Sequence, residues 1–155
     1  MELRPVVESD LERLNAIRNG ARAFLHDNSH YSLADTIRWW DETSPRWWAI
    51  THSDYMIGYF RTSNWRKSVV TIGADIDEKY RNRGIAKEMY PIFMRMLIED
   101  YGVEYFFLEV LEFNRHAYSL YKNLGFTEMF SQKSERGPES IRMGMSAITF
   151  KRIYG

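Results

Sequence analysis

The chain has 155 residues, of which 45% are hydrophobic, 27% are charged and 15% are aromatic. This length favours one domain with a single core over residues 1–155. Lysine plus arginine and aspartate plus glutamate number 21 each and cysteine is absent, which argues against a nucleic-acid or anionic-membrane partner, against disulfides and against a thiolate nucleophile.

The N-terminus has no feature of an export signal. The segment Met1–Pro5 lacks an apolar core, and no apolar run in the sequence is long enough to span a bilayer. We therefore expect a cytoplasmic protein that binds neither membrane nor nucleic acid.

The first third of the chain predicts a strand and two helices. The strand is expected over residues 2–7, and Ser9 is expected to cap the first helix because a serine oxygen accepts bonds from the first helical N–H groups. A loop rich in turn formers, over residues 23–31, then precedes a second helix at 33–42.

Three strands are predicted next. Trp47–Ile50 and Met56–Phe60 form a hairpin that turns near His52–Asp54. The run Val69–Ile76 is rich in β-branched residues and predicts a third strand, which pairs onward with the hairpin.

A long helix is predicted to begin after Gly84. Apolar residues recur at helical spacing, at Ile85, Met89, Ile92, Phe93, Met96 and Leu97. Pro91 lies inside this helix, where a proline deletes a backbone hydrogen bond at a cost of about 3 kcal/mol. We expect a kink there.

The C-terminal part of the chain alternates between strands and one helix. The predicted elements are a strand at 104–111, a helix at 114–123 and strands at 126–131 and 140–148, with a turn at Glu135–Pro138. A meander followed by this alternation predicts a mixed α+β sheet.

The junction between the Val69–Ile76 strand and the long helix can bind a phosphate group. A helix N-terminus leaves backbone N–H groups unpaired and carries partial positive charge. Gly84 lets the backbone approach an anion closely, Ala86 keeps bulk away, and Arg81 and Arg83 add positive charge.

Two segments resemble the GNAT superfamily of N-acetyltransferases. Arg81-x-x-Gly84-x-Ala86 resembles the Arg/Gln-x-x-Gly-x-Gly/Ala signature that grips the pyrophosphate of acetyl-coenzyme A, and the segment Asn114–Phe126 resembles the second cofactor-contacting segment. The resemblance implies a mixed, mostly antiparallel central sheet flanked by about four helices, with a splayed strand pair forming the acetyl-CoA cleft. It implies cofactor contacts from Ile76, Arg81, Asn82, Arg83, Gly84, Ile85, Ala86, Asn114 and Tyr121, where the Ile76 backbone donates to the thioester carbonyl.

Acetyl transfer to an amine needs a base for the amine and an acid for the leaving thiolate. Alternation along the 104–111 strand sends Leu108 and Val110 to one face and Glu109 to the other, so Glu109 is the candidate base, with a surface salt bridge as the alternative role. Tyr121 stays protonated at neutral pH and is the candidate acid, with packing against Phe126 as the alternative. A Glu and a Tyr at this separation have these roles in the family branch that acetylates ribosomal-protein N-termini.

Several other residues have both a functional and a structural interpretation. Asn114 either caps the helix that follows it or bonds the pantetheine arm of the cofactor. Asp75 and Asp77 either attract a cationic acceptor or face water, and Tyr118 is expected to point away from the site.

Neither histidines nor tryptophans indicate a further centre. The histidines lack ligand spacing, so we expect no metal; they are His26, His30, His52 and His116. The paired tryptophans either fill the core, which we prefer, or stack on an acceptor; they are Trp39, Trp40, Trp47 and Trp48.

The combined prediction is an acetyl-CoA-dependent N-acetyltransferase in which the amine attacks directly in a ternary complex, since no cysteine can carry acetyl. Arg18-Asn19 and Glu139–Met143 favour a small-molecule amine, such as an amino sugar or a polyamine. A protein N-terminus of the ribosomal type is an alternative, although no tyrosine-rich turn follows Phe126. A non-catalytic CoA-binding module that senses acetyl-CoA or docks a partner is another, and a homodimer is compatible with each.

Overall fold

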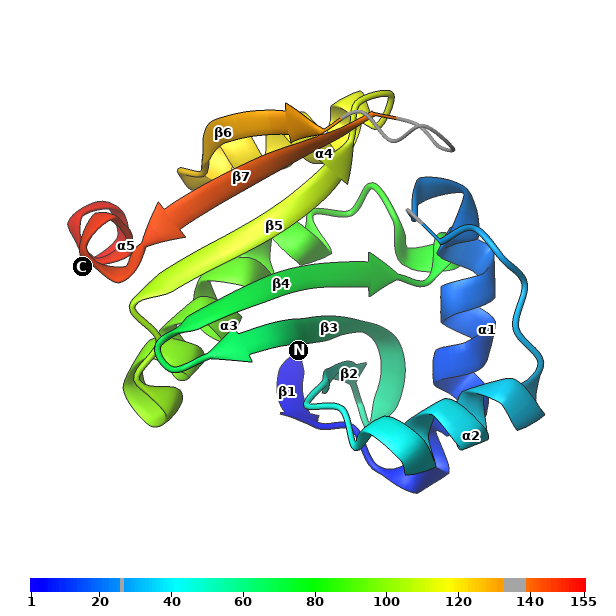
Figure 1. Ribbon diagram of the computed structural model, residues 1–155. Coiled ribbons are helices and arrows are strands. Elements are labelled where there is room, and N and C mark those ends of the chain that lie inside the picture. Colours follow the sequence, from blue (N-terminus) through cyan, green and yellow to red (C-terminus); the bar gives the residue numbers. More distant parts are fainter. Residues whose placement is uncertain (26, 133–138) are drawn as a thin grey trace. The chain divides into compact units, whose positions relative to one another are not determined.

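The computed structural model describes residues 1–25, 27–132 and 139–155 (Figure 1). The chain divides into two compact units, the first formed by residues 1–63 and 73–86 and the second by residues 64–72 and 87–155. Strand β4 (Val69–Ile76) and helix α3 (Ile85–Tyr101) each contain residues of both units. The expectation of one domain over residues 1–155 stays a prediction.

Seven strands make up the sheet. Besides β4 they are β1 (Glu2–Pro5), β2 (Trp48–His52), β3 (Tyr55–Arg66), β5 (Tyr105–Leu111), β6 (Thr127–Gln132) and β7 (Ser140–Ser146). Their hydrogen-bonded order is β1-β2-β3-β4-β5-β7-β6. The pairs β1–β2, β2–β3, β5–β7 and β6–β7 are antiparallel and β4–β5 is parallel, which confirms the predicted mixed, mostly antiparallel sheet.

Five α-helices occur in the described part of the chain. Besides α3 they are α1 (Leu11–Ala21), α2 (Leu33–Thr43), α4 (Arg115–Leu124) and α5 (Ala147–Tyr154), and short 3₁₀ turns lie at Glu8–Asp10, Arg22–Phe24 and Glu78–Tyr80. Helix α3 continues through Pro91 to Tyr101. The kink expected at Pro91 stays a prediction.

The first unit has its own apolar cluster beneath α1. The buried members are Val6, Leu11, Leu14, Ile17, Ala49, Met56 and Tyr59, against which Trp39, Trp40 and Trp47 pack. The β2–β3 hairpin turns through Ser53 and Asp54, whose φ angles of 49° and 65° are those of a tight two-residue hairpin turn. The predicted hairpin is therefore confirmed, but β3 extends six residues beyond the expected Phe60, to Arg66.

The predicted N-cap at Ser9 is wrong. Ser9 lies inside the 3₁₀ turn, and α1 begins at Leu11. The physical reason is the Asp10 carboxylate, which accepts two bonds from the Arg4 guanidinium (2.7 and 2.8 Å) and one from the Val7 backbone N–H (2.8 Å). These bonds tie the segment before the helix to strand β1. The N-cap position of α1 is therefore Asp10, one residue later than the expected Ser9.

The second unit is built around the long ladder between β5 and β7. These strands pair along their whole length, from Tyr105 opposite Ser146 to Leu111 opposite Ser140. The parallel register of β4 with β5 covers three residues of each strand, Val69–Thr71 with Tyr105–Phe107. The splay predicted farther along this strand pair stays a prediction.

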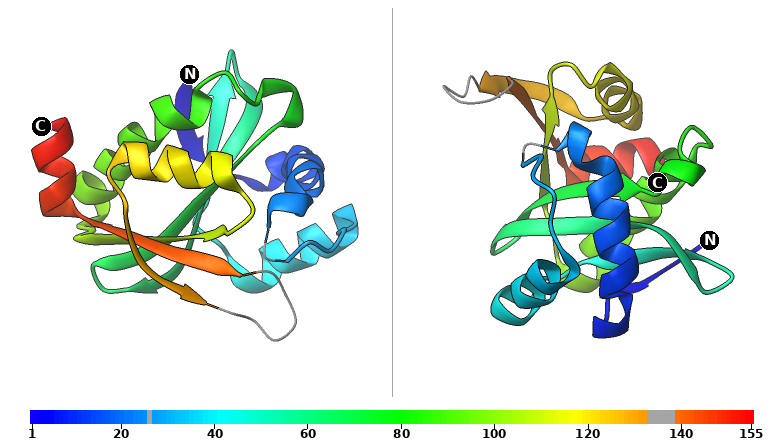
Figure 2. Two further views of the ribbon diagram at one scale, coloured as in Figure 1. Left: turned by 90° about the horizontal axis from the view of Figure 1, so that it is seen from above. Right: turned by 90° about the vertical axis from the view of Figure 1, so that its right-hand side faces the viewer.

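The C-terminus corrects another expectation. The last strand ends at Ser146, not Ile148, and α5 follows it directly (Figure 2). The Ser146 hydroxyl caps α5 by accepting from the Thr149 N–H at 3.0 Å, which ends the strand. The Tyr154 hydroxyl then donates to the Leu124 carbonyl at 2.6 Å and holds α5 against α4. The turn predicted at Glu135–Pro138 lies outside the described residues.

Gly125, which ends α4, provides a stability prediction. Its φ is 115°, and a Cβ there would lie 2.5 Å from Ile153 Cδ1 and 3.1 Å from Met145 Cε. Gly102 has φ 67° and no heavy atom within 4 Å of a Cβ, so Gly102→Ala is the matched control. We expect Gly102→Ala to cost about 1 kcal/mol of unfolding free energy and Gly125→Ala a further ~1–3 kcal/mol from overpacking, measured by urea unfolding. Equal costs would show that α5 moves aside without penalty.

Candidate functional site

The turn before α3 has the backbone shape of an anion site. Asn82 and Gly84 have left-handed φ angles of 61° and 76°, and such residues in a turn make neighbouring N–H groups converge on one side. A Cβ on Gly84 would meet nothing within 4 Å. The left-handed backbone therefore favours a glycine here, and the space around it is open.

Arg81 is bound by main-chain carbonyls. Its Nε donates to the Ile76 carbonyl and its Nη2 to the Gly20 carbonyl, each at 3.1 Å, and the guanidinium lies 5.4 Å from the centre of the Phe24 ring. Arg81 therefore joins the end of β4 to the end of α1. In this arrangement it shapes the turn that follows.

The other residues of the predicted phosphate loop occupy the turn and the first turn of α3. Arg83 is exposed, and its guanidinium lies 5.3 Å from the centre of the Tyr80 ring. Ile85 is buried and Ala86 half-buried, so these two can offer an anion only their backbone N–H groups. The side chains exposed in this turn are those of Asn82 and Arg83, and Gly84 between them and the helix is exposed as well.

Glu109 faces out of β5, as the alternation predicts. Leu108 and Val110 are buried, and the side chain of Glu109 is 40% exposed. Its Oε1 lies 3.5 Å from Nη1 of Arg142, the residue opposite it on β7. Arg142 in turn lies 4.5 Å from the centre of the Phe107 ring. The geometry contains the salt bridge weighed as the alternative role for Glu109.

Tyr121 is buried in the second unit among aromatic rings. Its ring meets Phe126 edge-on at 6.1 Å between centroids and Tyr90 edge-on at 5.6 Å. Its hydroxyl accepts a bond from the Tyr90 hydroxyl at 3.3 Å. Tyr118, one turn earlier, is half-buried and donates to Glu128 at 2.9 Å, so it points elsewhere, as expected.

Three polar residues with open interpretations make structural contacts. Asn114 caps α4, because its Oδ1 accepts from the Ala117 N–H at 3.2 Å. Asp75 is buried beside Arg61, with Nε to Oδ2 at 3.2 Å. Asp77 is buried, accepts from the Lys79 N–H at 2.9 Å and pairs with Arg13. The expectation that the two aspartates face water is therefore wrong.

A pocket of about 430 Å³ opens in the first unit between α1, α2 and the segment joining them. Its lining carries the carboxylates Asp27, Asp35 and Glu42, the guanidiniums Arg18 and Arg38, and the aromatic rings Tyr31, Trp39 and Trp47. Trp39 and Trp47 lie 4.7 Å apart between centroids and also pack on the apolar cluster, while Trp48 is buried. Two of the four paired tryptophans, Trp39 and Trp47, thus pack on the core and also line the pocket.

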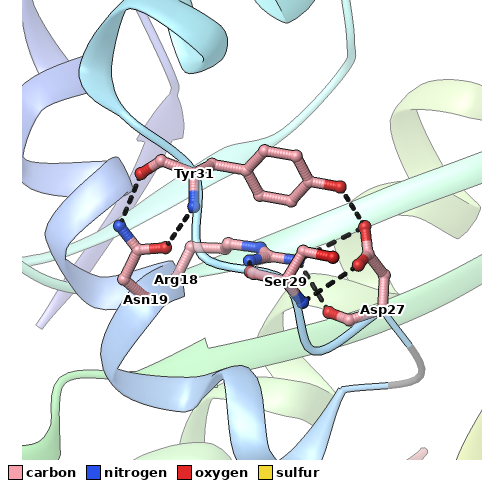
Figure 3. Close-up of polar contacts among 5 residues, drawn as sticks. All are labelled: Arg18, Asn19, Asp27, Ser29 and Tyr31. Carbon is pink, nitrogen blue, oxygen red and sulfur yellow. Dashed lines mark hydrogen bonds and ion pairs between the residues drawn. The ribbon is translucent and has the colours of Figure 1, made fainter.

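Arg18 organises one wall of this pocket (Figure 3). Its guanidinium donates to the carbonyls of Ser29 and of Asp27, the latter at 2.7 Å, and lies 4.3 Å from the centre of the Tyr31 ring. The Tyr31 hydroxyl donates to the Asp27 carboxylate. That bond lowers the pKa of Asp27 and raises the pKa of Tyr31, so at neutral pH the carboxylate is charged and the phenol is neutral.

Asn19 fixes the same segment through its backbone. Its Nδ2 donates to the Tyr31 carbonyl at 2.8 Å, and its Oδ1 accepts from the Tyr31 N–H at 3.0 Å (Figure 3). In the sequence, the Arg18-Asn19 pair indicated a small-molecule acceptor. The sequence did not predict that Arg18 and Asn19 bind the segment that joins α1 to α2. An Arg-Asn pair on a helix beside a loop of turn formers was the available signal.

Neither a metal cluster nor a membrane-spanning helix occurs in the described part of the chain. Within residues 1–25, 27–132 and 139–155, no cluster of histidine, aspartate and glutamate has the arrangement of a metal site. Over the same residues, no helix has the length and apolarity needed to cross a membrane. His26 lies outside the described residues.

Sequence comparison gives a family and one partial relative. The model of the family described as "Acetyltransferase (GNAT) domain" matches residues 1–127. A spermine/spermidine N(1)-acetyltransferase of Bacillus subtilis is 37% identical over 51 residues, and this match spans 33% of the chain and 34% of the relative.

Comparison of structures gives the same fold over nearly the whole chain. A spermidine N-acetyltransferase variant from Vibrio cholerae superposes with a TM-score of 0.86 at 15% identity, covering 100% of both chains. An acetyltransferase from Salmonella typhimurium, solved with its cofactor acetyl-CoA, has a TM-score of 0.75 at 16% identity and covers 94% of this chain and 93% of its own. At these identities the comparison shows a shared fold.

The paired bonds of Asn19 give a testable local prediction. In Asn19→Ala the Tyr31 N–H loses its acceptor, and we expect its amide hydrogen to exchange about fivefold or more faster, since one such bond contributes about 1 kcal/mol or more. Asn28→Ala, in the same segment, is the control. Unchanged exchange at Tyr31 in Asn19→Ala would show that other contacts hold the segment.

Proposed function

The chain belongs to the GNAT acetyltransferase family, and we propose that it transfers acetyl from acetyl-CoA to a primary amine of a small cationic molecule, of the polyamine class, by direct attack in a ternary complex. The family assignment confirms the resemblance and the acetyltransferase class predicted from the motifs. The partial polyamine-acetylating relative supports the choice of acceptor class.

The pocket of the first unit carries the acceptor proposal. Three of its lining residues are carboxylates and two are guanidiniums, so its charge favours a cation. Asp27 lies 3.6 Å from Arg18 and Asp35 lies 3.7 Å from Arg38. Glu42 lines the pocket from α2, the helix that also carries Asp35. Trp39 adds an aromatic ring that attracts an ammonium group, as the Tyr31 ring already does with the Arg18 guanidinium.

The turn before α3 is the proposed site for the pyrophosphate of acetyl-CoA. Backbone N–H groups of Gly84, Ile85 and Ala86, together with the side chains of Asn82 and Arg83, meet the phosphates there. Arg81 holds the turn in shape through the carbonyls of Ile76 and Gly20. The fit to a diphosphate rests on the left-handed turn, the open space around Gly84 and the dipole of the long helix.

Four more residues are proposed to act on the thioester end of the cosubstrate. The Ile76 N–H donates to the thioester carbonyl and Asn114 bonds the pantetheine arm. Glu109, or a water that it holds, takes the proton from the amine. Tyr121 gives its proton to the departing sulfur. The bond between Glu109 and Arg142 is long, at 3.5 Å, and half exposed, so it leaves the carboxylate free to exchange partners.

The function is tested by measuring CoA thiol release with a panel of acceptors. We expect release with spermidine and spermine above that with glucosamine or with a peptide that begins with alanine. Release with the peptide alone would support an N-terminal acetyltransferase in place of this proposal. Binding of CoA without release for any amine would support a sensor.

Glu42→Gln tests whether the pocket binds the acceptor. We expect the KM for spermidine to rise about two- to fivefold, the size expected for losing one exposed charge pair, while the KM for acetyl-CoA stays the same. Asp41→Asn makes the same charge change one residue away on α2, outside the pocket lining, and should leave both constants unchanged. Equal effects of the two substitutions would remove the pocket from the proposal.

Tyr121→Phe tests the proposed acid. Removing the hydroxyl should lower kcat about 10²-fold or more, the typical contribution of general acid catalysis. The dissociation constant of CoA should not change, because the ring and its aromatic contacts remain. Full turnover in this variant would exclude Tyr121 as the acid while leaving the cosubstrate proposal intact.

A further inference from the structure

A second tyrosine meets the proposed acid in the interior of the second unit. Tyr90 on α3 and Tyr121 on α4 are 0% and 9% exposed, and their rings meet edge-on at 84°. Their hydroxyl oxygens lie 3.3 Å apart, with Tyr90 as the donor. Two phenols that are distant in sequence thus form one hydrogen-bonded pair.

The bond between the two hydroxyls limits where the Tyr121 proton can point. A phenol has one proton and acceptor lone pairs on the same oxygen. When Tyr90 donates in this pair, the Tyr121 oxygen accepts and the Tyr121 proton is directed toward a different acceptor. Contacts with Tyr90 and Phe126 hold the Tyr121 ring at two of its edges. With the ring held, the bond with Tyr90 limits the directions in which the Tyr121 proton can point.

The same bond matters more after the Tyr121 proton has left. A buried phenolate without a donor is costly, because burial disfavours charge. A hydrogen bond to a charged partner is worth about twice a neutral one. The Tyr90 hydroxyl therefore stabilises the deprotonated form of Tyr121 more than the protonated form.

We propose that Tyr90 is a positioning residue for acetyl transfer, which orients the hydroxyl of Tyr121 and stabilises its phenolate. This rests on the proposed role of Tyr121 as the acid. As the nitrogen–carbon bond forms, the carbon–sulfur bond breaks and its electron pair goes to sulfur. Tyr121 gives sulfur its proton, keeps the bond from Tyr90 as a phenolate, and regains a proton from solvent after CoA thiol departs.

Tyr90→Phe keeps the ring and removes the hydroxyl. We expect kcat to fall about tenfold or more, from the loss of one hydrogen bond to a charged group. The KM of each substrate and the dissociation constant of CoA should stay within about twofold of the wild-type values, because Tyr121 is a neutral phenol in both the free and the substrate-bound enzyme. Tyr118→Phe is the matched control. Tyr118 lies on α4, as Tyr121 does, and its hydroxyl bonds Glu128. We expect kcat to stay unchanged in this variant.

A double substitution separates positioning from packing. If Tyr90 acts through Tyr121, the Tyr90→Phe/Tyr121→Phe double variant should be no slower than Tyr121→Phe alone, because the group that Tyr90 serves is already gone. A multiplied loss in the double variant would show that Tyr90 only supports the fold, and would overturn the proposal.

Two other outcomes keep this inference distinct from the proposed function. A wild-type kcat in Tyr90→Phe, next to an inactive Tyr121→Phe, would overturn the role of Tyr90 and leave the acid in place. Full activity in Tyr121→Phe would overturn both roles together, while CoA binding and amine preference would still report on the rest of the proposed function.

Discussion

The first unit depends on one guanidinium that satisfies the ends of two elements. Carbonyls at the C-terminus of a helix lack partners within that helix, and Arg81 donates to one near the end of α1, at Gly20, and to Ile76 at the end of β4. Positive charge at that helix end also meets the favourable end of the dipole. The turn toward α3 therefore starts from a fixed point, and the left-handed residues Asn82 and Gly84 can shape its backbone.

Local patterns in the sequence predicted the elements that local forces decide. The β-branched run Val69–Ile76 is a strand with the expected bounds, and Asn114 caps the helix that follows it. Expectations failed where one particular side-chain bond decides the boundary of an element. Arg4 holds Asp10 and moves the start of α1 away from Ser9, and the cap at Ser146 ends an apolar run that continues in sequence as α5.

In the candidate site, too, the features that local patterns decide were predicted and the contacts between elements were not. Alternation predicted that Glu109 leaves the buried face of β5, because that depends only on the strand's own period. Its partner Arg142 follows from the register between β5 and β7, and the partner of Tyr121 from the packing of α3 on α4. The spacing of residues within one segment predicts neither the Glu109–Arg142 pair nor the Tyr90–Tyr121 pair. Likewise, the charge of Arg81 was visible in the sequence, but the two carbonyls that bind it were not.

Two buried tyrosines, Tyr59 in the first unit and Tyr121 in the second, differ in what surrounds their oxygens. Tyr59 is fully buried and stacks on Trp47 at 5.0 Å, and burial, reinforced by the Asp75 carboxylate, raises the pKa of its hydroxyl well above the ordinary value. Losing a proton there would place a second negative charge beside the first. Tyr121 is buried too, but its oxygen accepts from Tyr90. Burial makes any phenol hold its proton, and a donor aimed at the oxygen is what lets a buried phenol release it. By this criterion Tyr121 fits the proposed role of acid better than Tyr59 does.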